Sequence, residues 1–191
     1  MKCDPTLEDI CRTQLTLEDD IYTVEILKTL PSEAYRAMRE HLMKIADGMV
    51  IIYSITSKES FNSAQRIWDN LQKVERHLQR KGVPVVLVGN KADLEGQRDV
   101  SKDEGKQLAD RLGCEFEECS AKAGPGDFER IVKRLVVRIR DQKQTERLQA
   151  ERRKKAEEKA AVDAAVAAAK AEKRKNSFWR RSIDRVTNKM V

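Results

Sequence analysis

Long hydrophobic runs, aromatic residues and paired cysteines are scarce in this 191-residue sequence, and each shortage bears on the kind of protein it encodes. The apolar runs at 49–53 and 83–88 are far shorter than the ~20 residues that a membrane-spanning helix needs, so we expect no transmembrane segment. The first residues, Met1-Lys2-Cys3-Asp4, lack the apolar stretch of a secretory signal. None of the four cysteines belongs to a CxxC pair, which favours free thiols in a reducing compartment, and we therefore expect a cytoplasmic protein.

An excess of positive charge is also lacking over most of the chain. The net charge is +6, and residues 170–191, with eight lysines and arginines against two acids, account for all of it. Residues 1–169 are therefore neutral overall. Any partner inferred from the basic character of the chain belongs to its C-terminal segment.

Residues 48–140 alternate between strand-like and helix-like segments, a pattern typical of an α/β fold in which helices cover a parallel sheet. Three short runs predict the strands: 48–53, 83–88 and 115–119. Capping boxes at Thr56–Glu59 and Ser101–Glu104 predict the starts of two helices, which we expect to end at Gly82 and Leu112. Apolar residues at helical spacing from 128 to 139 predict a third helix.

The two ends of the chain differ from this middle part. Near the N-terminus, strands at 10–17 and 21–27 around a turn at 18–20 predict a hairpin, and a short helical segment at 32–41 follows. Residues 141–191 are charged and rich in alanine, which suits either a solvated helical extension or a disordered tail. We therefore divide the chain into a domain at 1–140 and a basic tail at 141–191.

Two polar loops carry the chemistry of the predicted domain. The loop Gly89-Asn90-Lys91-Ala92-Asp93 follows one predicted strand, and Ser120-Ala121-Lys122 follows the next. Because ligands bind at the carboxyl ends of the strands in an open parallel sheet, we expect both loops to line one site. The Asp93 carboxylate can accept two hydrogen bonds at once from the N1–H and 2-amino groups of guanine, an edge that adenine lacks.

The other loop residues fit the rest of a guanine base. The Asn90 side chain suits a ring nitrogen or carbonyl, and the Ala121 N–H can donate to the guanine O6. The stems of Lys91 and Lys122 can cover the ring faces. Two polar turns without a ligand are the alternative, and the strand in front of each turn makes this the weaker interpretation.

These motifs resemble those of the Ras-type small GTPases. The resemblance rests on 86–94 and 119–122, on 4–9 as the first switch and effector segment, and on 35–39 as the second-switch helix. It implies a P-loop NTPase-like, Rossmann-like G domain with a mostly parallel sheet and a hairpin edge. It also implies binding of GTP and GDP with Mg²⁺, and a switch role in signal transduction.

The resemblance also implies roles for individual residues. The residues around the nucleotide base would be Asn90, Lys91, Asp93, Ser120, Ala121 and Lys122. Thr6 would coordinate Mg²⁺. The effector-binding residues would be Asp4, Pro5, Leu7, Glu8 and Asp9.

The sequence departs from the family pattern in the parts that handle phosphate. It contains no GxxxxGK[ST] loop, whose backbone amides and lysine hold the phosphates, so we expect the first strand, the phosphate loop and the first helix to be missing. The Asp, Gly and Gln of the second switch fall on Lys28, Pro31 and Ser32. Pro31 has no N–H with which to sense a γ-phosphate. We therefore expect weak nucleotide and Mg²⁺ binding and impaired hydrolysis.

Two functional hypotheses remain open. In the first, the chain is an N-terminally truncated Ras-like GTPase that switches between GTP and GDP. In the second, it is a non-enzymatic pseudo-GTPase that binds effector or regulator proteins. In either case the missing strand would leave open sheet edges, so we expect marginal stability or oligomers.

The basic tail suggests a further partner. Residues 170–191 combine lysines and arginines with apolar residues and could bind an anionic membrane surface, and a plain solvated helix is an equal alternative. Nucleic acid ranks third. No cysteine follows Cys119, so we expect no prenylation motif, although the cytoplasmic face of the plasma membrane is still a candidate location.

Overall fold

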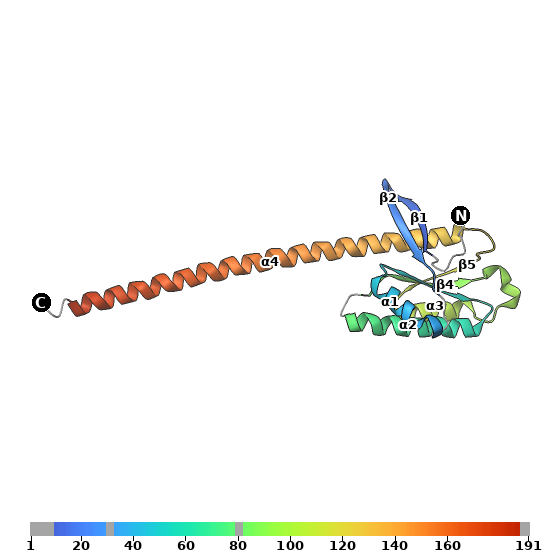
Figure 1. Ribbon diagram of the computed structural model, residues 1–191, viewed down its shortest axis with the longest axis horizontal. Helices are drawn as coiled ribbons and strands as arrows, with labels where there is room; N and C mark the ends of the chain where they lie inside the picture. The colour runs from blue at the N-terminus through green and yellow to red at the C-terminus, as the bar shows by residue number, and fades with distance from the viewer. Residues whose placement is uncertain (1–9, 30–32, 79–81, 188–191) are drawn as a thin grey trace. The chain divides into compact units, whose positions relative to one another are not determined.

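A computed structural model describes residues 10–29, 33–78 and 82–187 of the chain (Figure 1). The chain divides into two compact units, Met1–Asp141 and Gln142–Val191. The elements in chain order are β1 (Ile10–Leu17), β2 (Asp20–Leu27), the 3₁₀ turn η1 (Glu33–Tyr35), α1 (Arg36–Ile45), β3 (Met49–Ser54), α2 (Lys58–Leu78), β4 (Val85–Asn90), the 3₁₀ segment η2 (Ala92–Gln97), α3 (Lys102–Leu112), β5 (Glu115–Cys119) and α4 (Gly126–Thr187).

A three-stranded parallel sheet in the order β3-β4-β5 forms the centre of the first unit. Its middle strand, β4, is buried from Val85 to Gly89, as the continuous apolar run predicts. On one face of the sheet α1, α2 and α3 enclose a core around Tyr53, Leu71 and Leu108. On the other face Ile131 and Leu135 of α4 cover Val86 and Val88 (Figure 1). The predicted α/β arrangement, with helices on both faces of a parallel sheet, is confirmed.

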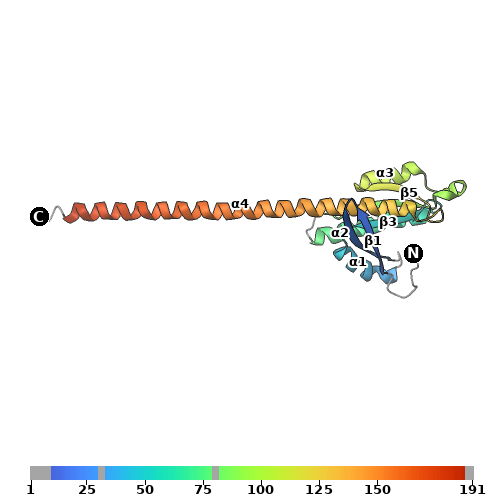
Figure 2. The same ribbon diagram turned by 90° about the horizontal axis from the view of Figure 1, so that it is seen from above.

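The hairpin forms a sheet of its own. β1 and β2 pair antiparallel along their whole length around the two-residue loop Glu18-Asp19, and Glu18 adopts the left-handed conformation, with φ 55°. The inner face of the hairpin packs on a second apolar stripe of α4, which Figure 2 shows beside β1 and β2. That stripe, Phe128, Val132 and Val136, is displaced by one residue from the stripe that covers the parallel sheet. The hairpin that the sequence predicted at the edge of the sheet therefore packs on α4 and forms a separate two-stranded sheet in the described part of the chain.

The outer edge of β3 is open over the residues that the structure describes. The Met49 N–H donates to the Pro84 carbonyl at 3.0 Å, and the Ile55 N–H donates to the Asn90 carbonyl at 3.0 Å. Because a parallel ladder alternates, the odd residues of β3 face β4, and the backbone groups of Val50 and Ile52 face outward. Ile52 is 49% exposed.

The predicted boundaries shift at several places. The strands predicted at 48–53 and 83–88 run instead from Met49 to Ser54 and from Val85 to Asn90. The later start of β4 follows from Pro84, which has no N–H to enter the ladder. The helix predicted to end at Gly82 is described as far as Leu78, and the three residues before Gly82, 79–81, lie outside the described ranges. The turn predicted at 18–20 is shorter, because Asp20 pairs with Leu17 in the hairpin.

The helix starts were predicted with mixed success. The capping box Ser101–Glu104 is confirmed in both directions, as the Ser101 hydroxyl accepts the Glu104 N–H and the Glu104 carboxylate accepts the Ser101 N–H. The capping box at 56–59 is wrong. Ser57 caps α2 instead, because its hydroxyl accepts the Ser60 N–H at 3.2 Å, and the Asp99 carboxylate accepts the Lys58 N–H at 2.8 Å. The helical segment predicted at 32–41 lies at Glu33–Ile45, and Ser32 itself is outside the described residues.

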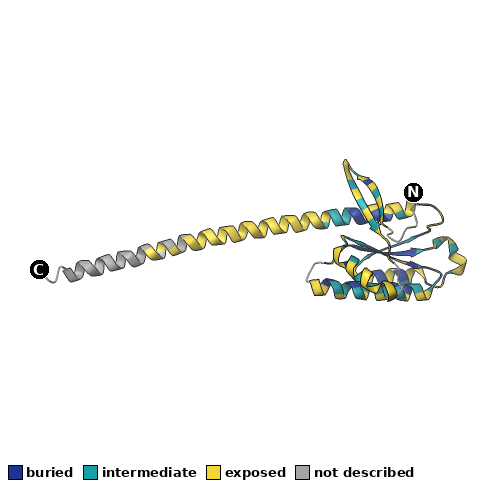
Figure 3. Ribbon diagram, viewed as in Figure 1, coloured by how far each residue is buried: buried dark blue, intermediate teal, exposed yellow. Residues whose placement is uncertain are grey.

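The second unit is helical from Gln142 to Thr187, so the helical alternative for the tail applies over that range. Between 143 and 165 every residue is exposed, in contrast to the first turns of α4 (Figure 3). Alanine and charged residues without an apolar stripe explain this pattern, because they favour a helix without requiring a partner surface. Within the described ranges no helix combines the length and the apolar character needed to span a membrane.

Candidate functional site

The two predicted loops leave the same edge of the parallel sheet. Asn90, the last residue of β4, is in register with Cys119, the last residue of β5. The chain then continues into η2 after β4 and into the turn Ser120–Ala123 after β5. The structure therefore brings together the six residues that the sequence places around a ligand: Asn90, Lys91, Asp93, Ser120, Ala121 and Lys122.

The Asn90 side chain joins the two loops through their backbones. Its Oδ1 accepts the Lys91 N–H at 2.7 Å and the Ala121 N–H at 3.1 Å. Lys91 adopts the left-handed conformation, with φ 67°, which turns the chain sharply after β4. Because Oδ1 serves both backbone amides, the Asn90 Nδ2 group is the donor that this side chain offers to a ring nitrogen. The Ala121 N–H, expected to donate to a base carbonyl, is engaged with Asn90 in this structure.

The Asp93 carboxylate is held across the gap between the loops by Ser120. The Ser120 hydroxyl donates to Asp93 Oδ1 at 2.5 Å and accepts the Ala123 N–H at 3.3 Å. Ser120 is buried, whereas Asp93 is exposed. The hydrogen bond from Ser120 is the main cause that lowers the pKa of Asp93, and a backbone hydrogen bond and then the positive charges of Lys122 and Lys91 lower it further. The carboxylate is therefore an ionised acceptor with one oxygen committed to Ser120.

A third connection between the loops involves Arg98, a residue that the sequence interpretation missed. Arg98 directly follows η2, and its guanidinium bonds to Glu95 of η2 and to Glu118 of β5. No periodicity or motif singles out this arginine among the 38 lysines and arginines of the chain. The only sequence signal was its position, five residues after Asp93.

The arrangement fits the base of a purine nucleotide better than it fits a metal ion. An exposed carboxylate and an amide donor lie in these loops at one edge of the sheet, and two lysines of the same loops are close enough for their charges to act on the carboxylate. Over the described ranges, no group of three His, Cys, Asp or Glu side chains could hold a metal ion. Thr6, the Mg²⁺ candidate, lies outside those ranges, so we derive no step through the metal.

A comparison with family sequence models decides the classification. The model of the Ras family matches residues 1–141. The chain belongs to the Ras family. Its parallel sheet and helical layers agree with this family, and the predicted P-loop NTPase-like fold class is thereby confirmed.

Curated relatives support the same family. A Ras-like protein of Laccaria bicolor is 41% identical over 120 residues, which cover 63% of this chain and 56% of that protein. In Dictyostelium discoideum, the Ras-like protein rasU is 37% identical over 119 residues (62% of this chain, 54% of the relative), and the Ras-like protein rasZ is 41% identical over 120 residues (63% and 55%). The chain thus spans about half the length of the curated relatives it matches. Ras family members in general bind GTP and GDP with Mg²⁺ and engage effector or regulator proteins.

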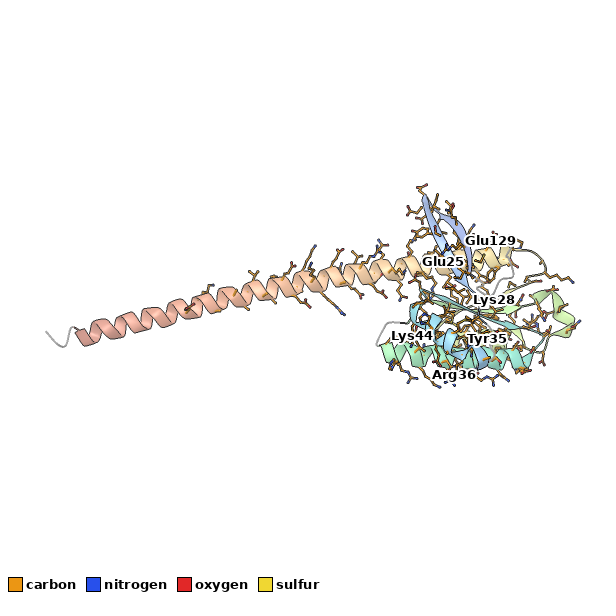
Figure 4. All side chains as sticks on the ribbon, in the orientation of Figure 1. Glu25, Lys28, Tyr35, Arg36, Lys44 and Glu129 are labelled. Atoms are coloured by element: carbon orange, nitrogen blue, oxygen red, sulfur yellow. The ribbon has the colours of Figure 1, made fainter. Side chains whose placement is uncertain are left out.

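Other residues predicted from the Ras resemblance are placed only in part. The effector candidates Asp4, Pro5, Leu7, Glu8 and Asp9, the metal candidate Thr6, and Pro31 and Ser32 of the second switch all lie outside the described residues. Lys28 directly follows β2. Figure 4 labels Lys28 together with Tyr35 of η1 and with Arg36 and Lys44 of α1, the helix that the sequence assigned to the second switch.

Proposed function

We propose that this chain recognises guanine nucleotides through the base-reading loops at 90–93 and 120–122, as one part of a GTP/GDP switch in signal transduction. The observation that carries the proposal is the ionised Asp93 carboxylate, which Ser120 holds across the two loops at 2.5 Å. In this proposal residues 1–140 are a partial G domain, and residues 141–191 are its basic extension.

Hydrogen bonding gives the proposed site its selectivity for guanine over adenine. Guanine presents two adjacent N–H donors to the carboxylate, whereas adenine presents none at the corresponding ring nitrogen. Each hydrogen bond to a charged acceptor contributes about 1.5–3 kcal/mol. Two such bonds correspond to a preference of roughly 10²–10⁴-fold. The ionised state of Asp93 is the state that this recognition requires.

Phosphate and metal binding by this chain are proposed to be weak, and hydrolysis to be impaired. The 191 residues contain no GxxxxGK[ST] loop, and phosphate contacts depend on such a loop. Lys28, Pro31 and Ser32 replace the family's Asp, Gly and Gln, so the second switch lacks its sensing N–H and its water-orienting amide. Thr6 remains the candidate ligand for Mg²⁺.

A non-enzymatic interaction module is the alternative, and the retained segment 4–9 beside the altered second switch favours it. In that alternative the effector candidates bind partner proteins whether or not nucleotide is present. Capture by a Ras-binding domain tests it: loss of capture on Glu8→Lys supports the alternative, and the absence of any capture by the unaltered chain refutes it.

The tail and the cellular location complete the proposal. We assign residues 170–191, with their eight basic side chains, to contact with an anionic membrane surface at the cytoplasmic face. Cys114 and Cys119 are free thiols, which supports a reducing compartment. Binding of the chain to vesicles with and without phosphatidylserine tests this assignment, because it requires that binding depend on the anionic lipid.

The central test measures nucleotide affinity directly. We expect a fluorescent GDP analogue to bind with micromolar or weaker affinity and to be preferred over the matching ADP analogue. Asp93→Asn should remove the preference for guanine and favour xanthine, whose ring presents an acceptor where guanine has the 2-amino group. Asp69→Asn, at an exposed carboxylate of α2, is the matched control. Equal binding of GDP and ADP refutes the proposal, and nanomolar Mg²⁺-dependent binding refutes the expected weakness.

A further inference from the structure

We propose that Arg98 is a positioning residue that couples the two base-reading loops, so that they are ordered together before any nucleotide binds. This inference rests on the proposed function, because it assigns to Arg98 the regulation of the same site. Arg98 would touch neither the base nor the phosphates. Its effect would pass through Glu95 and Glu118, the two carboxylates that it joins.

The hydrogen bonds of Arg98 use the whole guanidinium group. Nε and Nη2 donate to the two oxygens of Glu95 at 2.8 and 2.6 Å. Nη1 and Nη2 donate to the two oxygens of Glu118 at 2.8 and 3.0 Å. Nη1 also donates to the Val100 carbonyl at 3.0 Å. These bonds match the five N–H groups that an arginine offers, in the planar geometry that lysine cannot reproduce.

The two carboxylates lie at corresponding places beside the two loops. Glu95 follows Asp93 by two residues, and Glu118 precedes Ser120 by two residues. A single planar guanidinium group therefore ties the chain just after one loop to the chain just before the other. The Asp93–Ser120 hydrogen bond spans the same pair of loops, so its length depends on how these segments are held.

Burial distinguishes this cluster from an ordinary surface ion pair. The side chains of Arg98 and Glu118 are 16% and 10% exposed, whereas Glu95 is 70% exposed. The hydrogen bonds to Glu118 and then to Glu95 raise the pKa of Arg98, so its charge persists across the physiological pH range. Partly buried bidentate pairs hold geometry far better than exposed pairs, whose contribution is small. Of the two ion pairs that Arg98 makes, the pair with Glu118 therefore contributes more to the positioning of the loops than the pair with Glu95 does.

A nearby arginine supplies the matched control. Arg134 of α4 bonds to Glu115 and Glu117 on the same strand, β5, and its side chain is 50% exposed. Both arginines therefore pair with two carboxylates and involve β5. Only Arg98 also reaches the segment after the first loop. Replacing Arg134 should consequently leave both loops unchanged.

Amide hydrogen exchange of the nucleotide-free chain is the first readout. In Arg98→Gln we expect exchange at Lys91–Asp93 and at Ala121–Ala123 to rise together, by roughly tenfold or more, because the segments that flank both loops lose their common anchor. Exchange in β3 should not change. Arg98→Lys should resemble Arg98→Gln, and Arg134→Gln should resemble the unaltered chain. Unchanged exchange at either loop, or an equal rise in β3, overturns the proposal.

The second readout is discrimination between guanosine and inosine diphosphate. The two differ by the 2-amino group, from which Asp93 would accept a hydrogen bond. We expect Arg98→Gln to lower the ratio of the two affinities by roughly tenfold, and Glu118→Gln to lower it more than Glu95→Gln does. An unchanged ratio in Arg98→Gln overturns the positioning role. If the unaltered chain shows no preference for guanine, the proposed function fails, and the exchange experiment alone decides the role of Arg98.

Discussion

Replacing Gly105 by alanine should destabilise the domain, although the same change at an ordinary helix position is stabilising. Gly105 is buried in α3 against the sheet. A Cβ atom at this position would lie 2.5 Å from Cζ of Phe116 on β5 and 2.5 Å from the hydroxyl oxygen of Tyr53 on β3. Tyr53 is only 2% exposed in the main core and Phe116 is partly buried against the same core, so both rings would have to shift to make room.

The magnitude follows from two opposing effects. Alanine is more favourable than glycine in a helix interior by about 1 kcal/mol. Overpacking a close-packed core costs about 1–3 kcal/mol, and here two rings on different strands must shift, so the cost should lie at or above the upper end of that range. The net loss should be about 2 kcal/mol, which lowers the Tm by about 4–8 °C at about 2–4 °C per kcal/mol.

Thermal unfolding followed by circular dichroism measures this difference. Gly96→Ala is the control, because nothing lies within 4 Å of a Cβ at that position and its φ is not in the left-handed region. It should change the free energy of unfolding by less than about 0.5 kcal/mol. An unchanged or higher Tm in Gly105→Ala would show that the packing of α3 against β3 and β5 is wrong.

Three further results are expected. The Glu104 carboxylate accepts hydrogen bonds from Lys58 and from Ser101, which lower its pKa to about 2. Its stabilising contribution is therefore complete above its ordinary pKa of 4.5 and is lost as the pH falls toward 2. A carboxyl titration by NMR should show a higher pKa for Glu104 in Lys58→Met. Ser101→Ala removes half of the capping box and should cost about 1 kcal/mol, measured by urea unfolding, whereas no change would mean that the cap does not form in solution. Burial raises the pKa of Tyr53 to about 12, and its buried hydroxyl has no hydrogen-bond partner among the described residues. Tyr53→Phe should therefore leave the free energy of unfolding unchanged or raise it. A large loss of stability would contradict the packing around this ring.

The elements of the fold could be predicted from the sequence because each has a local signal. Apolar runs indicated the strands, and the capping box at Ser101 indicated the start of α3 correctly. The boundaries that shifted depend on partners distant in the chain. The start of β4 depends on the proline at position 84 and its bond to Met49, and α2 begins where Ser57 and Asp99 satisfy its first amides.

The candidate site was predictable in its residues but not in its connections. The two loops were identified because each follows an apolar strand, and their proximity follows from the topology of a parallel sheet. The bridge through Arg98 could not be found in the same way. It joins residues 20 positions apart, in a chain with 38 basic and 32 acidic residues, and only the fold selects which of them meet. Likewise, the sequence does not show that the Ala121 N–H donates its hydrogen bond to the Asn90 side chain.

The two borders of the parallel sheet differ in chemical character, and this difference limits how copies of the chain can assemble. The β5 border carries three glutamates in five residues, each paired with an arginine, and a border lined with charged side chains discourages another strand from adding there. The β3 border, where the backbone groups of Val50 and Ile52 face outward, carries no charged residue from Met49 to Ser54. Growth by strand addition can therefore start on one side of the sheet and has no equivalent side on which to continue. Association through the parallel sheet should therefore stop at small, closed complexes and should not extend into fibres.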